Sequence, residues 1–354
     1  MASPAKHIIL DCERMKYPHT GLYAFCKDLG NALVKEAVGS EASIAFYTPP
    51  ALTGFFGKNA AYLQQNSFHK LVMPSLKKFD VWHATHQSTL YYPYRQKIPV
   101  VLTVHDLNFL HGEEKTATKQ KTYISNLQKK VDRANAVVAI SAFTARELEQ
   151  HINLGNKKIT VIYNGCSVDE QIVATPPPVN AAGPFLFSIG TIAPKKNLHV
   201  LPALLVGNNY RLIIAGITQS EVYQQKIIGE ALKLGVADRL IFTGALSEES
   251  KKWYYIHCLA FVFPSIAEGF GLPVIEAMHY GKTVVLSKEG PLPEIAGPFA
   301  AYFEDFSGAA MRATLQAAIE KDLDATRGEQ ISGHARQYSW QKAANAYLHL
   351  YRTI

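Results

Sequence analysis

A strand, a glycine-rich loop and a helix start follow one another within residues 259–281, and this order constrains the fold more than any other stretch. The apolar run 259–263 is typical of a strand buried in a parallel sheet. The loop after it carries Gly269 and Gly271, which allow close backbone approach to a ligand, and Pro273 suits the first turn of a helix. A helix N-terminus presents free backbone N–H groups, so the segment predicts a site for an anion, typically a phosphate.

Two glutamates bracket this loop. Glu268 lies within it, and Glu276 lies in the first turns of the predicted helix. Carboxylates accept hydrogen bonds from sugar hydroxyls, so the two could hold sugars on either side of a diphosphate bound at the helix start. That arrangement fits a nucleotide sugar. The plainer alternatives are that Glu276 only complements the helix dipole and that Glu268 is a solvated loop residue.

Two further strand ends carry residues suited to the same ligand. The β-branched run 100–104 delivers His105 to the C-terminal end of a strand, where open parallel sheets bind ligands. Another predicted strand is followed by Gly190 and then by Lys195 and Lys196, before a predicted helix start. Lysines are unfavourable at a helix N-terminus unless an anion is bound there, so this pair predicts phosphate binding. A strand-end histidine that only packs is the alternative for His105.

The string E-G-F-G-L-P-V-I-E-A-M resembles the E-x7-E signature of the family-4 retaining glycosyltransferases, which have the GT-B fold. The V-H-D-L string at His105, the G-T-x-x-P-K-K-N string from Gly190, and Gly21 at an early helix start also resemble elements of that family. Two positions depart from its pattern: Lys195 stands where arginine is commoner, and Thr191 stands where many relatives have arginine. A two-pronged guanidinium contact is therefore not expected at Lys195.

The resemblance implies roles for these residues. Lys196 would stabilise charge on the leaving diphosphate, Glu268 would hold the transferred sugar, and His105 would bridge sugar and phosphate; these three form the expected catalytic group. The expected donor-binding residues are Gly21, Gly190, Lys195, Lys196, Gly269, Phe270, Gly271, Leu272 and Glu276. Of these, Glu276 is expected at the ribose. No metal or other cofactor is expected, because lysines and helix-terminal amides can do the work of a cation.

Strand–helix alternation predicts an α/β protein without reference to any family. The resemblance implies the GT-B fold: two Rossmann-like domains facing a cleft, with a C-terminal helix that crosses back to the first domain. A proline-rich run at 175–178 is expected to mark the boundary. We therefore expect an acceptor-binding domain over 1–174 together with the helix 338–354, and a nucleotide-sugar-binding domain over 175–337.

The positive charge is uneven along the chain. Residues 1–173 hold 20 Lys and Arg against 14 Asp and Glu, while the whole chain of 354 residues has a net charge of +7. Such an excess favours an anionic partner. No nucleic-acid recognition motif accompanies it, so nucleic acid is not expected. An anionic membrane surface or a phosphate-bearing lipid acceptor fits better, and a basic surface that serves only solubility explains the charge equally well.

The chain lacks an apolar run of roughly 18 residues, and its first residues lack the apolar core of a signal peptide. We therefore expect a cytoplasmic protein whose membrane contact, if present, is peripheral. A D-x-D string at 322–324 spells the metal motif of a different glycosyltransferase fold, but it lies in a predicted helical stretch and is not expected to bind metal. His83 and His86 lack a nearby third ligand, which favours core packing or acceptor contact over a metal site.

The sequence thus predicts a retaining transferase that moves a hexosyl unit from a nucleoside diphosphate sugar to a hydroxyl of a glycan or lipid-linked acceptor. The Gly190 and His105 strings resemble those of mannosyl-type transferases in polysaccharide biosynthesis, which favours GDP-mannose as the donor, with a UDP-sugar next. The alternatives are a nucleotide-sugar epimerase or hydrolase on the same fold, and a non-catalytic glycan-binding module.

Overall fold

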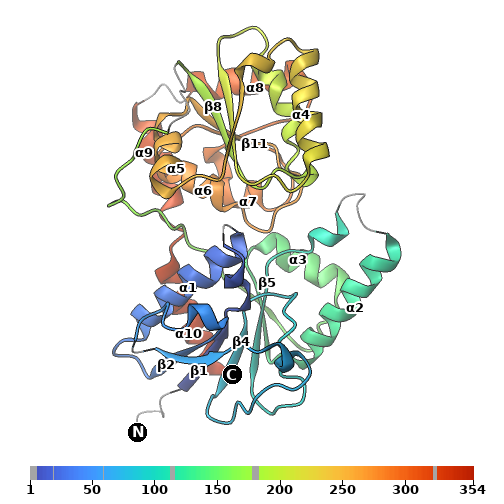
Figure 1. The fold of residues 1–354 in the computed structure, drawn as a ribbon, viewed down its shortest axis with the longest axis vertical. Helices are drawn as coiled ribbons and strands as arrows, with labels where there is room; N and C mark the ends of the chain where they lie inside the picture. Colours follow the sequence, from blue (N-terminus) through green and yellow to red (C-terminus); the bar gives the residue numbers. More distant parts are fainter. Residues whose placement is uncertain (1–5, 19, 59, 112–115, 178–182, 322–324) are drawn as a thin grey trace. The chain divides into compact units, whose positions relative to one another are not determined.

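The chain folds into two compact units, each with its own parallel sheet (Figure 1). The computed structural model describes residues 6–18, 20–58, 60–111, 116–177, 183–321 and 325–354. Unit 1 consists of Met1–Gly165 and Tyr338–Ile354, and unit 2 consists of Cys166–Gln337. The first unit therefore ends before residue 174, where the proline-rich run placed the expected boundary. The D-x-D string at 322–324 lies outside the described residues.

Unit 1 is built on a sheet of seven described strands in the order β3-β2-β1-β4-β5-β6-β7, with parallel pairing at each step. The strands are β1 (Lys6–Asp11), β2 (Ala42–Thr48), β3 (Ala61–Gln64), β4 (Val81–Ala84), β5 (Val100–Val104), β6 (Ala136–Ala139) and β7 (Ile159–Val161). The central strands β4, β5 and β6 are buried at every position, as continuous apolar runs predict. The order places the C-terminal ends of β1, β4 and β5 at one edge.

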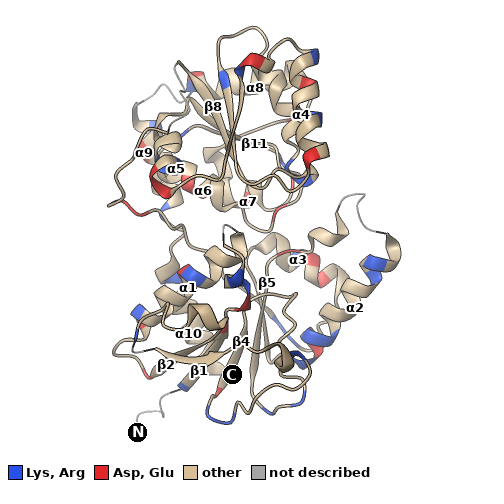
Figure 2. Ribbon diagram, viewed as in Figure 1, with Lys and Arg blue, Asp and Glu red and all other residues tan. Residues whose placement is uncertain are grey.

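The helices of unit 1 begin at polar caps. They are α1 (Gly21–Ala37), α2 (Ala117–Arg133), α3 (Ala142–His151) and α10 (Trp340–Thr353), with the short 3-10 segments η1 (Glu13–Lys16), η2 (Pro50–Leu52), η3 (Ser67–Lys70) and η4 (Asn108–Leu110). Thr20, Thr116, Ser141 and Ser339 each accept a hydrogen bond from the amide three residues on. Lysine and arginine recur along α2, as Figure 2 shows.

The C-terminal helix α10 completes the core of unit 1. The Tyr347 hydroxyl lies 2.9 Å from that of Thr103 on β5, and the Tyr351 hydroxyl lies 2.7 Å from Nδ1 of His83 on β4. The predicted return of the last helix to the first domain is therefore confirmed. Burial lowers the pKa of His83 to about 3, so this histidine is a neutral core residue, as the sequence favoured.

Unit 2 is built on a sheet of six described strands in the order β10-β9-β8-β11-β12-β13, again paired in parallel. The strands are β8 (Phe185–Ile189), β9 (Arg211–Ala215), β10 (Leu240–Gly244), β11 (Ala260–Phe263), β12 (Val284–Leu286) and β13 (Ala301–Tyr302). The helices are α4 (Glu221–Lys233), α5 (Glu248–His257), α6 (Leu272–His279), α7 (Leu292–Ala296), α8 (Gly308–Lys321) and α9 (Ala325–Ala335). The remaining short segments are η5 (Pro194–Lys196), η6 (Leu198–Leu205), η7 (Ala237–Arg239) and η8 (Gly297–Phe299).

One predicted helix differs in kind. Lys195 and Lys196 do not open an α-helix, as the strand–glycine–lysine pattern predicted. They belong to the single turn η5, and Asn197 follows in the left-handed region with φ 53°. The next segment, η6, is a 3-10 helix that contains Pro202, a residue without the N–H that an α-helix would use. The lysines are thus held by a tight turn, and the helix-dipole argument for them was wrong.

None of the helices within the described residues combines the length and the apolar character needed to cross a bilayer.

Candidate functional site

The site in unit 2 centres on the loop between β11 and α6, as the sequence predicted. Gly271 is the N-cap of α6 and has φ 102°, a conformation that L-residues rarely adopt. A Cβ at this position would also come within 2.8 Å of Leu292 Cδ2. Leu272 begins the helix, and Phe270 is buried before it. Glycine is therefore required for the chain to turn into α6 with the amides of its first turn at the loop.

Glu268 in this loop pairs with Lys196, which lies far away in sequence. Lys196 Nζ forms an ion pair with Glu268 Oε1, and the Ser265 hydroxyl lies 2.6 Å from the same oxygen. The side chains of Lys196 and Glu268 remain 12% and 14% exposed, so both charges can be reached from solvent. The Lys196 ammonium also lies 4.9 Å from the centre of the Phe263 ring. Two residues predicted to share one ligand are thus in direct contact.

Glycines make room for the lysine loop. Gly190 follows β8 with φ 153°, and a Cβ there would lie 3.4 Å from Lys196 Cε. The neighbouring Gly216 follows β9, and a Cβ on it would come within 2.0 Å of the Gly190 carbonyl oxygen. A side chain at Gly216 would collide with the backbone of Gly190, and one at Gly190 would be strained by its φ value. The two strand ends therefore approach each other through bare backbone, beside Lys196.

Lys195 and Lys196 differ in what they contribute. The Lys195 carbonyl oxygen accepts a hydrogen bond from the Ile266 amide at 3.0 Å and lies 3.2 Å from the Ser265 hydroxyl. The backbone of Lys195 therefore ties the lysine loop to the loop after β11. Its side chain is exposed, whereas that of Lys196 is directed to Glu268.

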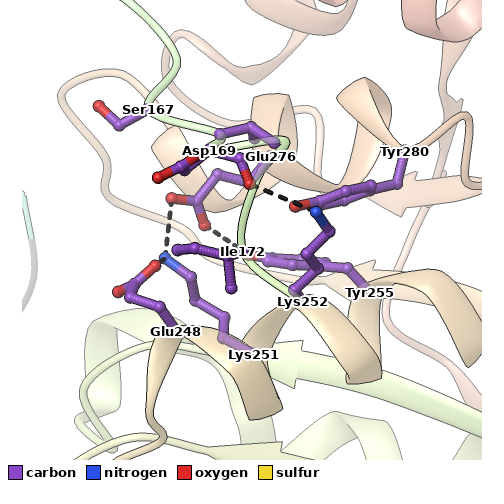
Figure 3. A pocket seen from close by; sticks show the side chains of 10 residues that line it. Ser167, Asp169, Ile172, Glu248, Lys251, Lys252, Tyr255, Glu276 and Tyr280 are labelled. Atoms are coloured by element: carbon purple, nitrogen blue, oxygen red, sulfur yellow. Dashed lines mark hydrogen bonds and ion pairs between the residues drawn. The ribbon is translucent and has the colours of Figure 1, made fainter. Parts of the chain in front are cut away.

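Glu276, on α6, is held by two residues of α5 (Figure 3). Lys251 Nζ lies 3.3 Å from Glu276 Oε1, and the Tyr255 hydroxyl donates to Oε2 at 2.8 Å. Glu276 lines a pocket together with Ser167, Val168, Asp169, Ile172, Glu248, Lys251, Lys252, Tyr255 and Tyr280. Glu276 and Glu268 thus bracket the first turn of α6, each with its own cationic partner.

His105 and Gly21 belong to unit 1. His105 follows β5, is 7% exposed, and donates from Nε2 to the Thr85 carbonyl at 2.8 Å. Burial lowers the pKa of His105 despite this hydrogen bond, so the ring is neutral and Nδ1 is its acceptor. The ring packs edge-on against Phe25 of α1. A neutral ring with this tautomer cannot donate to a sugar hydroxyl, so it would contact a sugar only as an acceptor.

Gly21 is the first residue of α1, which Thr20 caps through a 3.2 Å contact with the Tyr23 amide. A Cβ at Gly21 would meet no described atom within 4 Å. No packing contact within the described chain therefore explains a glycine here, in contrast to Gly271.

A buried polar cluster at the end of β1 was not predicted. Burial raises the pKa of Asp11 to about 7, and its Oδ2 accepts from the Thr89 hydroxyl at 2.5 Å. Burial alone would raise the pKa of Glu13, but hydrogen bonds with His86 and Lys16 outweigh this effect and lower the pKa to about 2. The sequence offers only a weak signal for this cluster, two acidic residues close together at the end of the first strand.

His86 belongs to this cluster. Its Nδ1 accepts from the Ser88 amide at 3.1 Å, and its Nε2 lies 3.1 Å from Arg14 Nε and 3.3 Å from Glu13 Oε2. Burial lowers the pKa of His86 to about 4, so the ring is neutral. No group of three or more His, Cys, Asp or Glu residues among those described could hold a metal ion.

Two family models match the chain. One, described as Glycosyltransferase Family 4, covers residues 30–170, and the other, described as Glycosyl transferases group 1, covers residues 174–331. Among solved structures, sucrose-phosphate synthase from Thermosynechococcus elongatus superposes with a TM-score of 0.77 at 17% identity, over 98% of each chain. HepE from Anabaena, solved with UDP and glucose, superposes with a TM-score of 0.73 at 18% identity, over 99% of this chain and 100% of that one.

Curated relatives include enzymes named as mannosyltransferases. The serotype-specific mannosyltransferase WbdA of Escherichia coli is 27% identical over 267 residues, which is 69% of this chain but 32% of WbdA. The chain thus spans about a third of that relative's length. The O-antigen chain mannosyltransferase B of Escherichia coli is 26% identical over 289 residues, covering 76% of this chain and 74% of that protein.

The two parallel sheets, with glycine loops at their strand ends, define an α/β protein of the GT-B class. Since the two family models together cover most of the chain, it belongs to the family-4 glycosyltransferases.

Proposed function

We propose that this protein is a retaining glycosyltransferase that moves a hexosyl unit from a nucleoside diphosphate sugar to an acceptor hydroxyl. The observation that carries the proposal is the contact of Lys196 with Glu268 in the loop that opens α6. A cation for the diphosphate and a carboxylate for the sugar hydroxyls stand beside helix-terminal amides. The family membership of the chain and the complex of HepE with UDP and glucose support the same assignment.

In this proposal, the bond between the anomeric carbon and the diphosphate oxygen breaks while the acceptor oxygen forms the new bond. Negative charge then grows on the leaving diphosphate. The Lys196 ammonium and the amides of residues 269–272 stabilise it, with Lys195 as an outer positive charge. Glu268 accepts from hydroxyls of the transferred sugar and Glu276 from those of the ribose. His105, through Nδ1, accepts from the donor sugar.

We propose that no metal ion is required, because Lys196 and the α6 amides supply the positive potential that a cation otherwise provides. Transfer that persists in EDTA would support this part of the proposal, and transfer restored only by Mg²⁺ would contradict it.

For the donor, the names of the curated relatives favour a mannosyl unit, so GDP-mannose is the first candidate and a UDP-sugar the second. For the acceptor, we propose a glycan or a lipid-linked glycan reached at the cytoplasmic face of a membrane. Phe68, Leu71 and Val72 are exposed beside Lys70 in unit 1, an apolar and basic surface that suits a peripheral contact.

The test begins with calorimetric titration against GDP-, UDP- and ADP-sugars, with and without Mg²⁺. Tight binding of one nucleotide class would identify the donor. Incubation with that donor and a panel of glycan acceptors should then yield a product whose new linkage keeps the donor's anomeric configuration, read by proton NMR. Free sugar or an epimerised donor without acceptor transfer would favour a hydrolase or epimerase. Binding of glycans without any nucleotide binding would favour a non-catalytic glycan-binding module.

A further inference from the structure

We propose that Lys251 and Tyr255 of α5 are positioning residues that set the Glu276 carboxylate for the ribose diol of the donor nucleotide. The inference rests on the proposed function, in which Glu276 accepts from the ribose. It adds that the selectivity of the protein for a nucleotide with an intact ribose is built on a second helix, which does not itself touch the sugar.

The geometry fixes both carboxylate oxygens of Glu276 (Figure 3). Oε1 faces Lys251 Nζ at 3.3 Å, and Oε2 accepts from the Tyr255 hydroxyl at 2.8 Å. Lys251 and Tyr255 are one helical turn apart, so they share a face of α5. A carboxylate with one donor on each oxygen cannot rotate without losing a hydrogen bond.

Tyr255 and Lys251 both keep the protonated form that pairs with Glu276. Tyr255 is fully buried, and burial raises the pKa of its hydroxyl well above the usual value, so it remains a hydrogen-bond donor. For Lys251, burial acts to lower the pKa, but the charges of Glu276 and Glu248 outweigh it and raise it. Lys251 therefore stays charged and Tyr255 stays protonated at every pH at which the protein would work.

The carboxylate is held but not covered. The Glu276 side chain is 17% exposed and lines the pocket with Asp169, Ile172 and Tyr280. Each carboxylate oxygen can accept a second hydrogen bond, and a ribose offers two adjacent hydroxyl donors. Tyr280 stacks on Tyr255 with ring centres 5.9 Å apart, which buttresses the wall of the pocket. The arrangement leaves the free acceptor sites of Glu276 in a fixed orientation for a cis-diol.

A purely structural role is the competing explanation. Lys251 also pairs with Glu248 at 2.8 Å within α5, so the ion pairs could simply fasten α5 to α6. The two explanations differ in one measurable quantity, the affinity ratio between a nucleotide and its 2′,3′-dideoxy analogue. Looser packing would weaken both ligands equally, whereas a misdirected carboxylate would weaken only the ligand that has the diol.

The experiment measures dissociation constants of GDP and UDP, each against its 2′,3′-dideoxy form, by calorimetry. The variants are Lys251→Gln, Lys251→Arg and Tyr255→Phe. Lys233→Gln is the matched control, since Lys233 forms an exposed ion pair with Glu230 on α4. We expect Lys251→Gln to weaken the ribonucleotide about tenfold and Tyr255→Phe to weaken it less, with the dideoxy form unchanged in both. Lys251→Arg should restore part of the loss, and the control should match the wild type.

Equal weakening of both ligands, or no change in either, would overturn the positioning role while leaving the proposed function intact. If the wild-type protein binds neither nucleotide, the inference fails, and the proposed function fails with it if ADP is not bound either. If the wild type binds but does not prefer the ribose, the role of Glu276 fails while diphosphate recognition stands. Thermal unfolding of each variant shows whether a lost affinity reflects a lost fold.

Discussion

The two units hold their functional candidates in opposite ways. In unit 2, Lys196, Glu268 and Glu276 are charged, partly exposed and paired with one another or with α5. In unit 1, Asp11 and His105 are buried in the interior at the strand ends, where burial governs their protonation. The first arrangement suits a charged ligand that exchanges places with solvent. In the second, burial keeps His105 neutral and raises the pKa of Asp11 to about 7. The contrast teaches that the charged candidates of unit 2 remain open to a ligand, whereas burial holds those of unit 1 in place.

The largest expected effect comes from removing the cation of unit 2. Lys196→Ala should lower the transfer rate by about 10²–10³-fold and abolish measurable donor binding, because the cation that pairs with Glu268 is then lost from the loop that opens α6. Transfer assays and calorimetry with the identified donor would measure this. Lys233→Ala serves as the control on an exposed helix. Unchanged donor affinity in Lys196→Ala would contradict the role given to unit 2, since Lys196 would then not be the residue that binds the diphosphate.

The next effect tests burial in unit 1. The folded Asp11 pKa of about 7 lies above the ordinary value of 3.8, so the unfolded chain binds fewer protons between these limits and stability falls as pH rises from about 4 to 7. Asp11→Asn cannot ionise and should remove this loss. The unfolding free energy of Asp11→Asn minus that of the wild type should therefore be on the order of 3 kcal/mol larger at pH 7 than at pH 4.

Urea unfolding of both proteins across that pH range measures the difference. The comparison with wild type is essential, because His86, with a folded pKa of about 4, contributes a stability change of opposite sign. A constant difference between the two proteins at all pH values would show that Asp11 is ionised in the folded state.

Substitutions of two helix-start glycines are expected to have smaller effects, one on stability and the other on transfer. Gly271→Ala should destabilise the protein by about 2 kcal/mol, because alanine at φ 102° is strained and its Cβ approaches Leu292. Gly21→Ala should cost no stability, because its Cβ has no described neighbour within 4 Å, yet it should reduce transfer if a ligand approaches the start of α1. Denaturant unfolding and transfer assays separate the two quantities.

A stability loss at Gly21 equal to that at Gly271 would remove the distinction between the two positions. Gly229→Ala, in the interior of α4 with no described atom near its Cβ, is the control and should gain about 0.5–1 kcal/mol.

The smallest effect separates the paired lysines. Lys195→Ala keeps the backbone carbonyl that binds the Ile266 amide, so the loop should keep its shape. Because only an exposed charge is lost, donor affinity should fall about threefold, and less at high salt. Calorimetry at two salt concentrations checks both statements. A loss as large as that of Lys196→Ala would mean that Lys195 is the main phosphate ligand.

Much of unit 2 could be predicted because its signals are local. The strand, Gly271 and the helix start lie within one stretch, and the resemblance supplied the partner loop with Lys196. The sequence predicted that Lys196 and Glu268 bind parts of the same ligand, but it did not predict the ion pair between them. The 3-10 form of η6 could not be predicted from the helix-start pattern alone, because Pro202, which lacks the N–H of an α-helix, lies further along the segment.

Unit 1 was predicted less well because its cluster is assembled by topology. Asp11 is the last residue of β1 and His86 follows β4, and these strands are neighbours only through the sheet order. No spacing within one segment brings the two together. The partners of Glu276 were missed for a similar reason, since Lys251 and Tyr255 lie on α5 and a charged run there is usually a solvated surface.

The position of α10 in unit 1 has a consequence for synthesis. A ribosome completes all of unit 2, residues 166–337, before it makes the helix whose Tyr347 and Tyr351 reach Thr103 and His83. Throughout that interval, the residues of β4 and β5 that Tyr347 and Tyr351 contact lack these partners. The unit that begins first is therefore the last that can finish folding, and the nascent chain is most exposed to chaperones and to aggregation through its own N-terminal sheet.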